Sequence, residues 1–563
     1  MKIKKQKENK TKNEKLKKNI NININFTIVA IVLIAIFCIC VTPITLQNDT
    51  YYTIKIGELI KNNGIDMMDH FSWHENLSYT YPHWLYDLCT YFIYAIGGFK
   101  GIYIITCALS VILGISIFLV NSKLTKNKSI SFIITIGAIY VLKPYIAARA
   151  QLVTFILFIW EIFFIEKFIE NRKIGYGIGL IIISVLIANL HVATWPFFFV
   201  LFLPYIAEYL ISLISDIIIY KKDRELVIKY KIKVAQKKNN LERVGELQTK
   251  LNELEDKNIK IKAKREDENN SYKLIIKRKK NVKFLIIIMI ICAFTGLLTP
   301  IGDTPYTYLY KTMEGNTTES ISEHLPLTLI NNNEAMCILV IFLAILIFTK
   351  VKIRLSDLFM ITGLCCLMFA TRRQLSMLTL IGSVVLTRLI VEMIQIYTKN
   401  NGLKEFEEAF KHIGVVISLV VLIGIMGYDN IKPRLDDKFV DSKSYPVEAC
   451  DYILENIDLS TAKFYNEYNY GSYMLFRGIP VFIDSRADLY APEFSGLKDD
   501  IFTDFIDVSS IGTFYEDILE KYNITHVILY SNSKMSMIID ETKDPHYSKI
   551  YKDDYFVIYE RVK

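Results

Sequence analysis

Apolar segments long enough to cross a membrane recur along most of this chain, and they constrain its fold more than any other feature. Hydrophobic residues make up 52% of the 563 residues, and the mean hydropathy is +0.28. These values are typical of a polytopic α-helical membrane protein and exclude disordered, collagen-like and disulfide-stapled classes. We predict eleven membrane spans, near residues 26–46, 100–120, 129–142, 150–169, 175–190, 192–219, 284–300, 334–349, 355–371, 374–396 and 412–428.

Charge is distributed unevenly along the chain. Residues 1–24 contain nine Lys and two Glu, and residues 221–283 contain 21 Lys and Arg against 10 Asp and Glu. Residues 431–563 are acidic, with 24 Asp and Glu against 15 Lys and Arg. Because basic loops stay in the cytoplasm, we expect a multi-pass plasma-membrane protein with a cytoplasmic N-terminus and an extracytoplasmic C-terminus. The basic segments adjoin membrane spans, so we expect no nucleic-acid partner.

Spans and charges together divide the chain into five regions. They are a cytoplasmic basic tail (1–24), a first membrane part (25–220) with a large outer loop (47–99), a basic cytoplasmic insertion (221–283), a second membrane part (284–429) and an extracytoplasmic α/β domain (430–563). Leucines at helical spacing predict a helix or helical hairpin in the insertion. Amphipathic stretches predict interfacial helices at 51–62 and 83–96. Short β-rich runs in the last region lie at 462–465, 481–484, 525–530 and 555–559.

The first outer loop carries most of the candidate catalytic groups. Asp49 follows the first span directly, so its carboxylate is expected at the membrane–water boundary. There it could take a proton from an acceptor while an amphiphilic donor stays in the lipid. Asp69, His70 and His83 are further candidates in the same loop. The alternatives are that Asp49 only ends a helix and that the aromatic-flanked histidines are simply packed.

Cations beside the outer ends of spans form a second group of candidates. Arg149, Arg372 and Arg373 occur where the positive-inside rule disfavours them. The planar guanidinium matches phosphate oxygens, so a lipid-linked phosphate is a natural partner. The alternative is that these side chains reach outer-leaflet headgroups. His191 closes a short span and could hold phosphate, ligate a metal or pack a helix end.

Three charged residues in the tail follow an apolar β-rich run. Asp484, Arg486 and Asp488 alternate along the sequence. They could form a structural ion pair that holds the region together, or they could recognise an acceptor or partner from outside. No HExxH, Walker A, GxGxxG or GxSxG motif is present, which argues against common soluble chemistries.

The order of short motifs resembles that of the GT-C superfamily of integral-membrane glycosyltransferases, and in particular a group of bacterial membrane proteins. The resemblance covers nearly the whole chain except residues 1–24 and 221–283. The matching motifs are Asp49, Gly57-Glu58, Asp69-His70-Phe71-Ser72, His83-Trp84-Leu85, Ala148-Arg149-Ala150-Gln151-Leu152, Ala188-Asn189-Leu190-His191, Thr299-Pro300-Ile301-Gly302, Ile321-Ser322-Glu323-His324, Asn469-Tyr470-Gly471-Ser472-Tyr473 and the run from Pro480 to Tyr490.

This resemblance implies a polyprenyl-phosphate-linked sugar donor and transfer on the outer face to a glycan, lipid or protein acceptor. It implies that Asp49 is the catalytic base, although this chain differs from the usual pattern in having Thr50-Tyr51-Tyr52 after it. Asp69 would assist in orientation or metal binding, so a divalent metal stays open. Arg149, His191 and one of Arg372 or Arg373 would hold the phosphate.

Two other functions remain open beside the glycosyltransferase. One is a transporter or flippase of a lipid-linked or anionic solute, which would favour ionisable residues deep within spans. The other is a non-catalytic assembly protein of the cell envelope, with the tail as its binding module.

Overall fold

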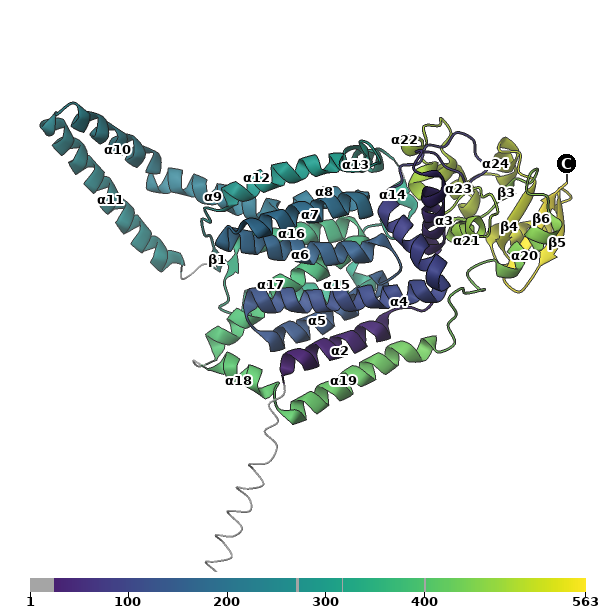
Figure 1. Ribbon diagram of the computed structural model, residues 1–563, viewed down its shortest axis with the longest axis horizontal. Helices are drawn as coiled ribbons and strands as arrows, with labels where there is room; N and C mark the ends of the chain where they lie inside the picture. Colours follow the sequence, from purple (N-terminus) through teal and green to yellow (C-terminus); the bar gives the residue numbers. More distant parts are fainter. Residues whose placement is uncertain (1–24, 270–272, 316, 399–400, 563) are drawn as a thin grey trace, which may run out of the picture.

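The structure, a computed structural model, describes residues 25–562 apart from 270–272, 316 and 399–400 (Figure 1). The predicted basic tail, residues 1–24, therefore lies outside the described residues.

A bundle of long helices forms the body of the molecule, with their axes roughly aligned (Figure 1). Each of the eleven predicted apolar runs contains a helix, as expected from their composition. The helices are α2 (Phe26–Val41), α4 (Trp84–Thr125), α5 (Lys128–Leu142), α6 (Ala150–Asn171), α7 (Ile174–Leu190), α8 (Trp195–Val200), α9 (Leu203–Tyr220), α12 (Val282–Ala293), α15 (Asn333–Phe348), α16 (Leu355–Ala370), α17 (Leu375–Tyr397) and α19 (Ile413–Ile431).

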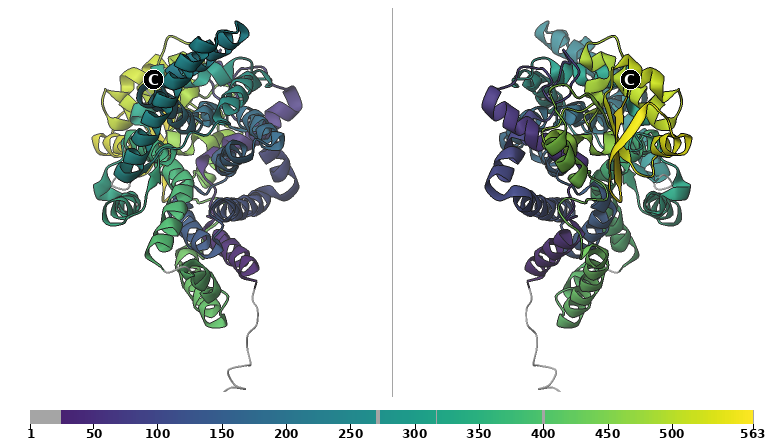
Figure 2. Two further views of the ribbon diagram at one scale, coloured as in Figure 1. Left: turned by 90° about the vertical axis from the view of Figure 1, so that its left-hand side faces the viewer. Right: turned by 90° about the vertical axis from the view of Figure 1, so that its right-hand side faces the viewer.

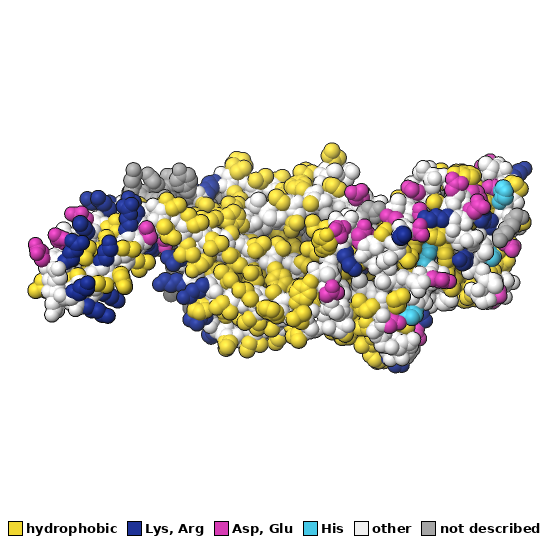
Figure 3. Space-filling model, turned by 90° about the horizontal axis from the view of Figure 1, so that it is seen from above, with side chains coloured by type: hydrophobic (Ala, Val, Ile, Leu, Met, Phe, Trp, Pro, Cys, Tyr) yellow, Lys and Arg dark blue, Asp and Glu magenta, His cyan; other side chains and the backbone are white. Residues whose placement is uncertain are grey.

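Four helical segments are long and apolar enough to cross a membrane by length and composition, among the residues described: Trp84–Thr125, Val192–Tyr220, Arg372–Tyr397 and Ile413–Arg434. Five more apolar helices are shorter, namely Phe26–Val41, Ile174–Leu190, Val282–Leu297, Asn333–Phe348 and Leu355–Ala370. The count of eleven spans stays a prediction. Seen from above, the bundle presents a broad apolar surface between two charged ends (Figure 3).

A single glycine marks the bend at which the chain leaves the first outer loop and enters the bundle. Gly98 lies inside α4 with φ 58° and ψ −153°, a conformation that is open to glycine because it lacks a Cβ. This residue separates the amphipathic start of α4 from the apolar part that enters the bundle. Before it, α3 (Asn48–Asn63) lies across the end of the bundle, so both amphipathic stretches of the loop are helical (Figure 1).

The tail contains a four-stranded sheet in the order β3-β4-β6-β5, which faces the viewer in the right-hand view of Figure 2. Strands β3 and β4 are parallel, and the other two pairs are antiparallel. The strands are β3 (Phe464–Tyr465), β4 (His526–Tyr530), β5 (Tyr547–Lys552) and β6 (Phe556–Arg561). The helices around them are α20 (Val447–Asn456), α21 (Tyr468–Phe476), α22 (Pro492–Ser495), α23 (Ile501–Ser510), α24 (Tyr515–Lys521) and α25 (Lys534–Thr542).

One of the four β-rich runs was wrongly predicted as part of this sheet. Residues 481–484 form no strand; instead Val481 makes a parallel bridge to Ser72 in the first outer loop. Conversely, β5 was missed, because its pattern is polar and half exposed. The first loop and the tail share one hydrophobic core, so the tail packs on the loop rather than standing alone. Trp73 belongs to this packing and donates its indole N–H to the Phe464 carbonyl at 2.9 Å.

The insertion forms a helical hairpin at the opposite end of the bundle from the sheet (Figure 1). Its helices, α10 (Lys222–Lys237) and α11 (Leu241–Asn269), pack through a small apolar cluster that includes Ile232 and Leu251. The predicted helical hairpin is therefore present. A two-residue parallel pair, β1 (Leu274–Ile275) with β2 (Ile353–Arg354), follows the hairpin. Shorter helices complete the chain: α13 (Thr304–Glu314), α14 (Thr317–Ser320) and α18 (Gly402–Ala409).

Candidate active site

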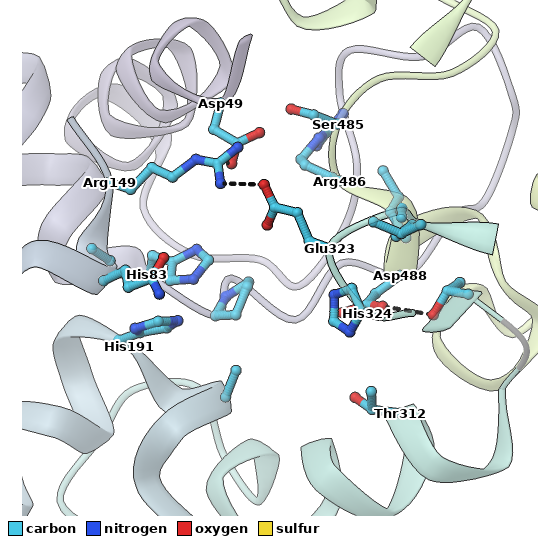
Figure 4. A pocket seen from close by; sticks show the side chains of 18 of the residues that line it. Asp49, His83, Arg149, His191, Thr312, Glu323, His324, Ser485, Arg486 and Asp488 are labelled. Atoms are coloured by element: carbon cyan, nitrogen blue, oxygen red, sulfur yellow. Dashed lines mark hydrogen bonds and ion pairs between the residues drawn. The ribbon is translucent and has the colours of Figure 1, made fainter. Parts of the chain in front are cut away.

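A cavity of about 530 Å³ lies where the bundle meets the first loop and the tail (Figure 4). Its walls come from α3, from the loops between spans, from residues 308–324 and from residues 468–494. Three of the residues singled out from the sequence, Asp49, Arg149 and His191, all line it. His83 and Arg373 line it as well.

An arginine between two carboxylates crosses the cavity. Arg149 Nε lies 2.8 Å from Asp49 Oδ2, and Arg149 Nη1 lies 3.4 Å from Glu323 Oε1. Burial opposes the charge of Arg149, but the two carboxylates outweigh it and raise its pKa. Asp49 lies in the first turn of α3, where the helix dipole favours a negative charge. The candidate base is therefore already paired with a cation.

Backbone hydrogen bonds fix Glu323 opposite the α16–α17 turn. The N–H of Arg373 donates to the Glu323 carbonyl at 3.1 Å, and the N–H of Arg372 donates to the Leu325 carbonyl at 2.9 Å. Burial would raise the pKa of Glu323, but Arg149 and Arg373 lower it. Arg373 itself forms no ion pair with any residue that the structure describes. It is thus a pocket cation whose charge is available to an anionic ligand.

The two histidines beside these groups are neutral, and their rings pack at a tilt of 51°. Their rings, on His83 and His191, lie 4.9 Å apart between centroids, and Thr154 Oγ1 lies 2.9 Å from His191 Nδ1. Burial, with Arg373 and Arg149 nearby, lowers the pKa of His83 to about 3. Burial and His83 likewise lower the pKa of His191. These imidazoles can therefore hydrogen-bond to a phosphate but add no positive charge near neutral pH.

Asp69 lies outside this cavity, in a buried ion-pair cluster with the tail. Its Oδ1 accepts from Arg486 Nη1 at 2.6 Å, and its Oδ2 accepts from the Ser72 N–H and hydroxyl at 2.8 and 2.7 Å. Arg486 also binds Asp484 through Nη2 and Nε, at 2.7 and 2.9 Å. Tyr490 donates its hydroxyl to Asp484 at 2.5 Å. The geometry is that of a tether between loop and tail, with Asp69 out of reach of a ligand in the cavity.

A close backbone contact holds this cluster in place. A Cβ on Gly471 would lie 2.0 Å from the Ile483 carbonyl oxygen and 2.9 Å from Asp484 Cα. Only glycine therefore lets α21 approach the segment that carries Asp484. On the other side of α21, the Asn48 amide donates to the Tyr468 carbonyl at 2.9 Å, which joins the tail to the start of α3.

His70 and Arg372 do not line the cavity either. His70 Nε2 pairs with Asp66 Oδ2 at 2.6 Å on the exposed side of the loop. The Arg372 carbonyl accepts from the Tyr145 hydroxyl at 3.2 Å, so this residue helps to fix the turn. Of the two adjacent arginines, the structure brings only Arg373 into the cavity.

Further polar residues line the cavity opposite the histidine pair, among them Glu323, His324 and Asp488 (Figure 4). Arg486, the cation of the tether, lines the cavity as well. Asp488 accepts hydrogen bonds from the hydroxyls of Tyr308 and Thr317. The sequence signal for Glu323 and His324 was the short motif in the outer loop. Nothing in the sequence placed that loop beside Asp49, however, because the two are far apart along the chain.

Among the described residues, no group of three His, Cys, Asp or Glu side chains is arranged to hold a metal ion. The structure therefore offers no ligand set for the divalent metal that the sequence left open, and we derive no step through one.

Two solved structures of the oligosaccharyltransferase from Archaeoglobus fulgidus are similar to this chain. The apo form aligns with a TM-score of 0.51 and 11% identity over 89% of this chain and 69% of that one. A form tethered to an acceptor peptide with an NVT sequon aligns with a TM-score of 0.47 and 11% identity, over 95% and 74%. That enzyme is a GT-C superfamily membrane glycosyltransferase. The chain shares the overall fold of the apo enzyme.

No family model and no curated protein sequence matches the chain. The apolar helices, together with this fold, indicate a membrane protein. At 11% identity the likeness extends to the fold alone. The function of the chain therefore rests on the chemistry of its own cavity.

Proposed function

We propose that the protein is a membrane glycosyltransferase that moves a sugar from a polyprenyl-phosphate donor to an acceptor on the outer face. One observation carries this proposal: the cavity at the end of the apolar bundle contains both a carboxylate, Asp49, and a cation, Arg373, that forms no ion pair with the described residues. A lipid-linked donor needs a site at such a boundary, because its polyprenyl chain stays in the bilayer while its phosphate and sugar are polar.

The proposed reaction uses groups that already face the cavity. Asp49 takes the proton of the acceptor nucleophile, which forms a bond to the anomeric carbon of the sugar. The bond from that carbon to the phosphate oxygen breaks, and the polyprenyl phosphate leaves with the electron pair. Arg373 stabilises the charge that develops on the phosphate.

Arg149 links the base to the phosphate in this scheme. In the absence of donor it pairs with Asp49 at 2.8 Å. A bound phosphate would compete with Asp49 for the guanidinium, since both are anions that match its planar fork. Losing that partner would leave the Asp49 carboxylate free to accept the proton of the acceptor, so donor binding would prepare the base.

The roles of Asp49 and Arg373 can be separated by measuring transfer and binding side by side. We expect Asp49→Asn to lower transfer by about 10²–10⁴-fold, because a general base contributes that much, while polyprenyl phosphate still binds. Arg373→Gln should weaken binding of polyprenyl phosphate by roughly tenfold or more. Transfer is followed in membrane vesicles supplied with radiolabelled polyprenyl-phosphate sugars, and binding with polyprenyl phosphate in detergent micelles.

Arg372→Gln is the matched control, since this arginine is adjacent in sequence but lies outside the cavity. It should leave both measurements near the wild-type values. Near-normal transfer by Asp49→Asn would overturn the assignment of the base. Unchanged phosphate binding by Arg373→Gln would overturn the assignment of the donor site.

We also propose an orientation, with the hairpin in the cytoplasm and residues 430–563 outside. The opposite placement of hairpin and sheet on the bundle supports it (Figure 1), as does the basic charge of the hairpin. A reporter active only in the cytoplasm should be inactive when fused after Lys563 and active when inserted between α10 and α11. The reverse pattern would place the cavity on the cytoplasmic face and contradict transfer on the outer face.

A further inference from the structure

A second cavity, of about 620 Å³, lies at the hairpin end of the bundle, remote from the candidate active site. Its walls come from the first residues of α2 and α5, the end of α4, and the segment from α18 to Lys411. Phe26 holds these walls together: its ring packs edge-on against Phe132 of α5 and Phe410 after α18, at 5.7 and 5.2 Å. This basic cavity is therefore part of the packed fold.

Positive charge dominates the lining of the basic cavity. It contains four lysines, Lys123, Lys126, Lys128 and Lys411, and a single carboxylate, Glu407. The Glu407 carboxylate accepts the backbone N–H of Lys128 at 2.9 Å. None of the four lysines forms an ion pair with a carboxylate in the part of the chain that the structure describes. Three positive charges are thus left without a counter-charge.

Two features inside the cavity indicate an anionic ligand. The N-termini of α2 and α5 both open into it, and their helix dipoles favour negative charge. The side chains of Asn25, Asn127 and Glu407 already accept the N–H groups of Thr27, Ile130 and Lys128, so a ligand would interact with the dipoles rather than with free N–H groups. Independently, Ser129 lines the cavity, is 1% exposed, and has no hydrogen-bond partner for its hydroxyl among the described residues. An unsatisfied buried hydroxyl is unfavourable, so a ligand oxygen that accepts from it would remove this cost.

The surroundings favour a lipid over a free ion. The basic cavity lies at the end of an apolar bundle, and α2 continues from it with large apolar side chains exposed every three to four residues: Ile28, Val32, Ile36 and Ile39. Acyl chains can lie along such a surface while a phosphate occupies the basic cavity. We propose that this cavity binds the phosphodiester headgroup of an anionic phospholipid, with lysines as counter-charges and Ser129 as a hydrogen-bond donor. The inference is independent of the glycosyltransferase proposal.

The test uses the full-length protein in phosphatidylcholine nanodiscs that contain a minor fraction of phosphatidylglycerol. Retained phosphatidylglycerol is measured by native mass spectrometry. We choose Lys126→Gln/Lys128→Gln/Lys411→Gln and keep Lys123, because its ammonium lies over the Trp160 ring at 5.5 Å. Each lysine near an anionic headgroup contributes about fivefold in affinity, so the triple variant should bind on the order of 100-fold more weakly.

A charge-matched control separates a specific site from general attraction to anionic lipid. Lys237→Gln/Lys238→Gln/Lys250→Gln removes the same charge from the hairpin, and it should retain phosphatidylglycerol. Equal loss in both triple variants, or no loss in either, would overturn the site. Displacement of the lipid by millimolar inorganic phosphate would show that a free anion suffices, and would overturn the lipid assignment.

Ser129→Ala tests the hydrogen bond by itself. The variant should bind phosphatidylglycerol several-fold more weakly, because the donated hydrogen bond is lost. Its thermal stability without anionic lipid should be unchanged or higher, since the hydroxyl has no protein partner to lose. Unchanged lipid binding together with raised stability would remove Ser129 from the proposed site.

Discussion

Two clusters in this molecule have the same composition, an arginine between two carboxylates, but opposite exposure. In the tether, the side chains of Asp69, Arg486 and Asp484 are 1%, 3% and 0% exposed. In the cavity, the side chains of Asp49, Arg149 and Glu323 are 23%, 25% and 50% exposed.

Hydrogen bonding separates the two clusters further. Every oxygen of Asp69 and Asp484 accepts from Arg486, Ser72, Tyr490 or the backbone, and the Arg486 guanidinium also lies over the Tyr79 ring at 5.0 Å. In the cavity, Arg149 has one short contact to Asp49 and one long contact to Glu323. A fully bonded buried cluster resists exchange, whereas a half-exposed one can exchange a partner for a ligand. Identical residue types thus serve structure in one place and ligand exchange in the other.

The largest expected effect comes from removing the two arginines in turn. Arg486→Met leaves two buried carboxylates without a cation and should lower the free energy of unfolding by about 3–5 kcal/mol. Arg149→Met, the matched variant, should lower it by about 1 kcal/mol or less, because water can solvate the carboxylates that it leaves. Denaturant titration of the purified protein in micelles measures both. Equal losses would remove the distinction between tether and cavity.

A smaller effect is the pH dependence of the free energy of unfolding that Arg486→Met loses. Burial alone would raise the pKa of Asp69, but Arg486 and Ser72 lower it below the unfolded value of 3.8. The ionised Asp69 therefore stabilises the fold at any pH above 3.8, and this stabilisation is lost only when the pH falls through the lowered pKa. Without the guanidinium, burial should raise the pKa of Asp69, and the variant should then lose stability as pH rises. The destabilisation by Arg486→Met should therefore shrink by at most about 1.4 kcal/mol per pH unit, through Asp69, as pH falls from about 7 toward 4.5.

Arg149→Met provides the comparison for this pH series as well. Its small destabilisation should change little over the same range, because both carboxylates of the cavity reach water. A loss for Arg486→Met that stays constant with pH would show that Asp69 is ionised in the variant, and hence that water or another cation reaches it.

The helical bundle and the hairpin were predictable from the sequence because hydrophobicity and helical periodicity are local properties. Asp49 and Arg149 were predictable as candidates because each adjoins the end of an apolar run. Whether Asp69 lies in the same site as Asp49, and which of Arg372 and Arg373 enters it, could not be resolved from the sequence. Neighbouring residues of one type share the same local pattern, and only their contacts distinguish them.

The sequence by itself determined which segments are helical and apolar and where charge gathers. Unpaired backbone groups are excluded from lipid, so long apolar runs form helices. Only the tertiary structure decided that Asp69 meets Arg486 across 417 residues, that Val481 pairs with the first loop, and that Glu323 faces Asp49 through Arg149. These contacts depend on how distant elements pack, and no local pattern encodes them. The division between tether and cavity is therefore a property of the fold.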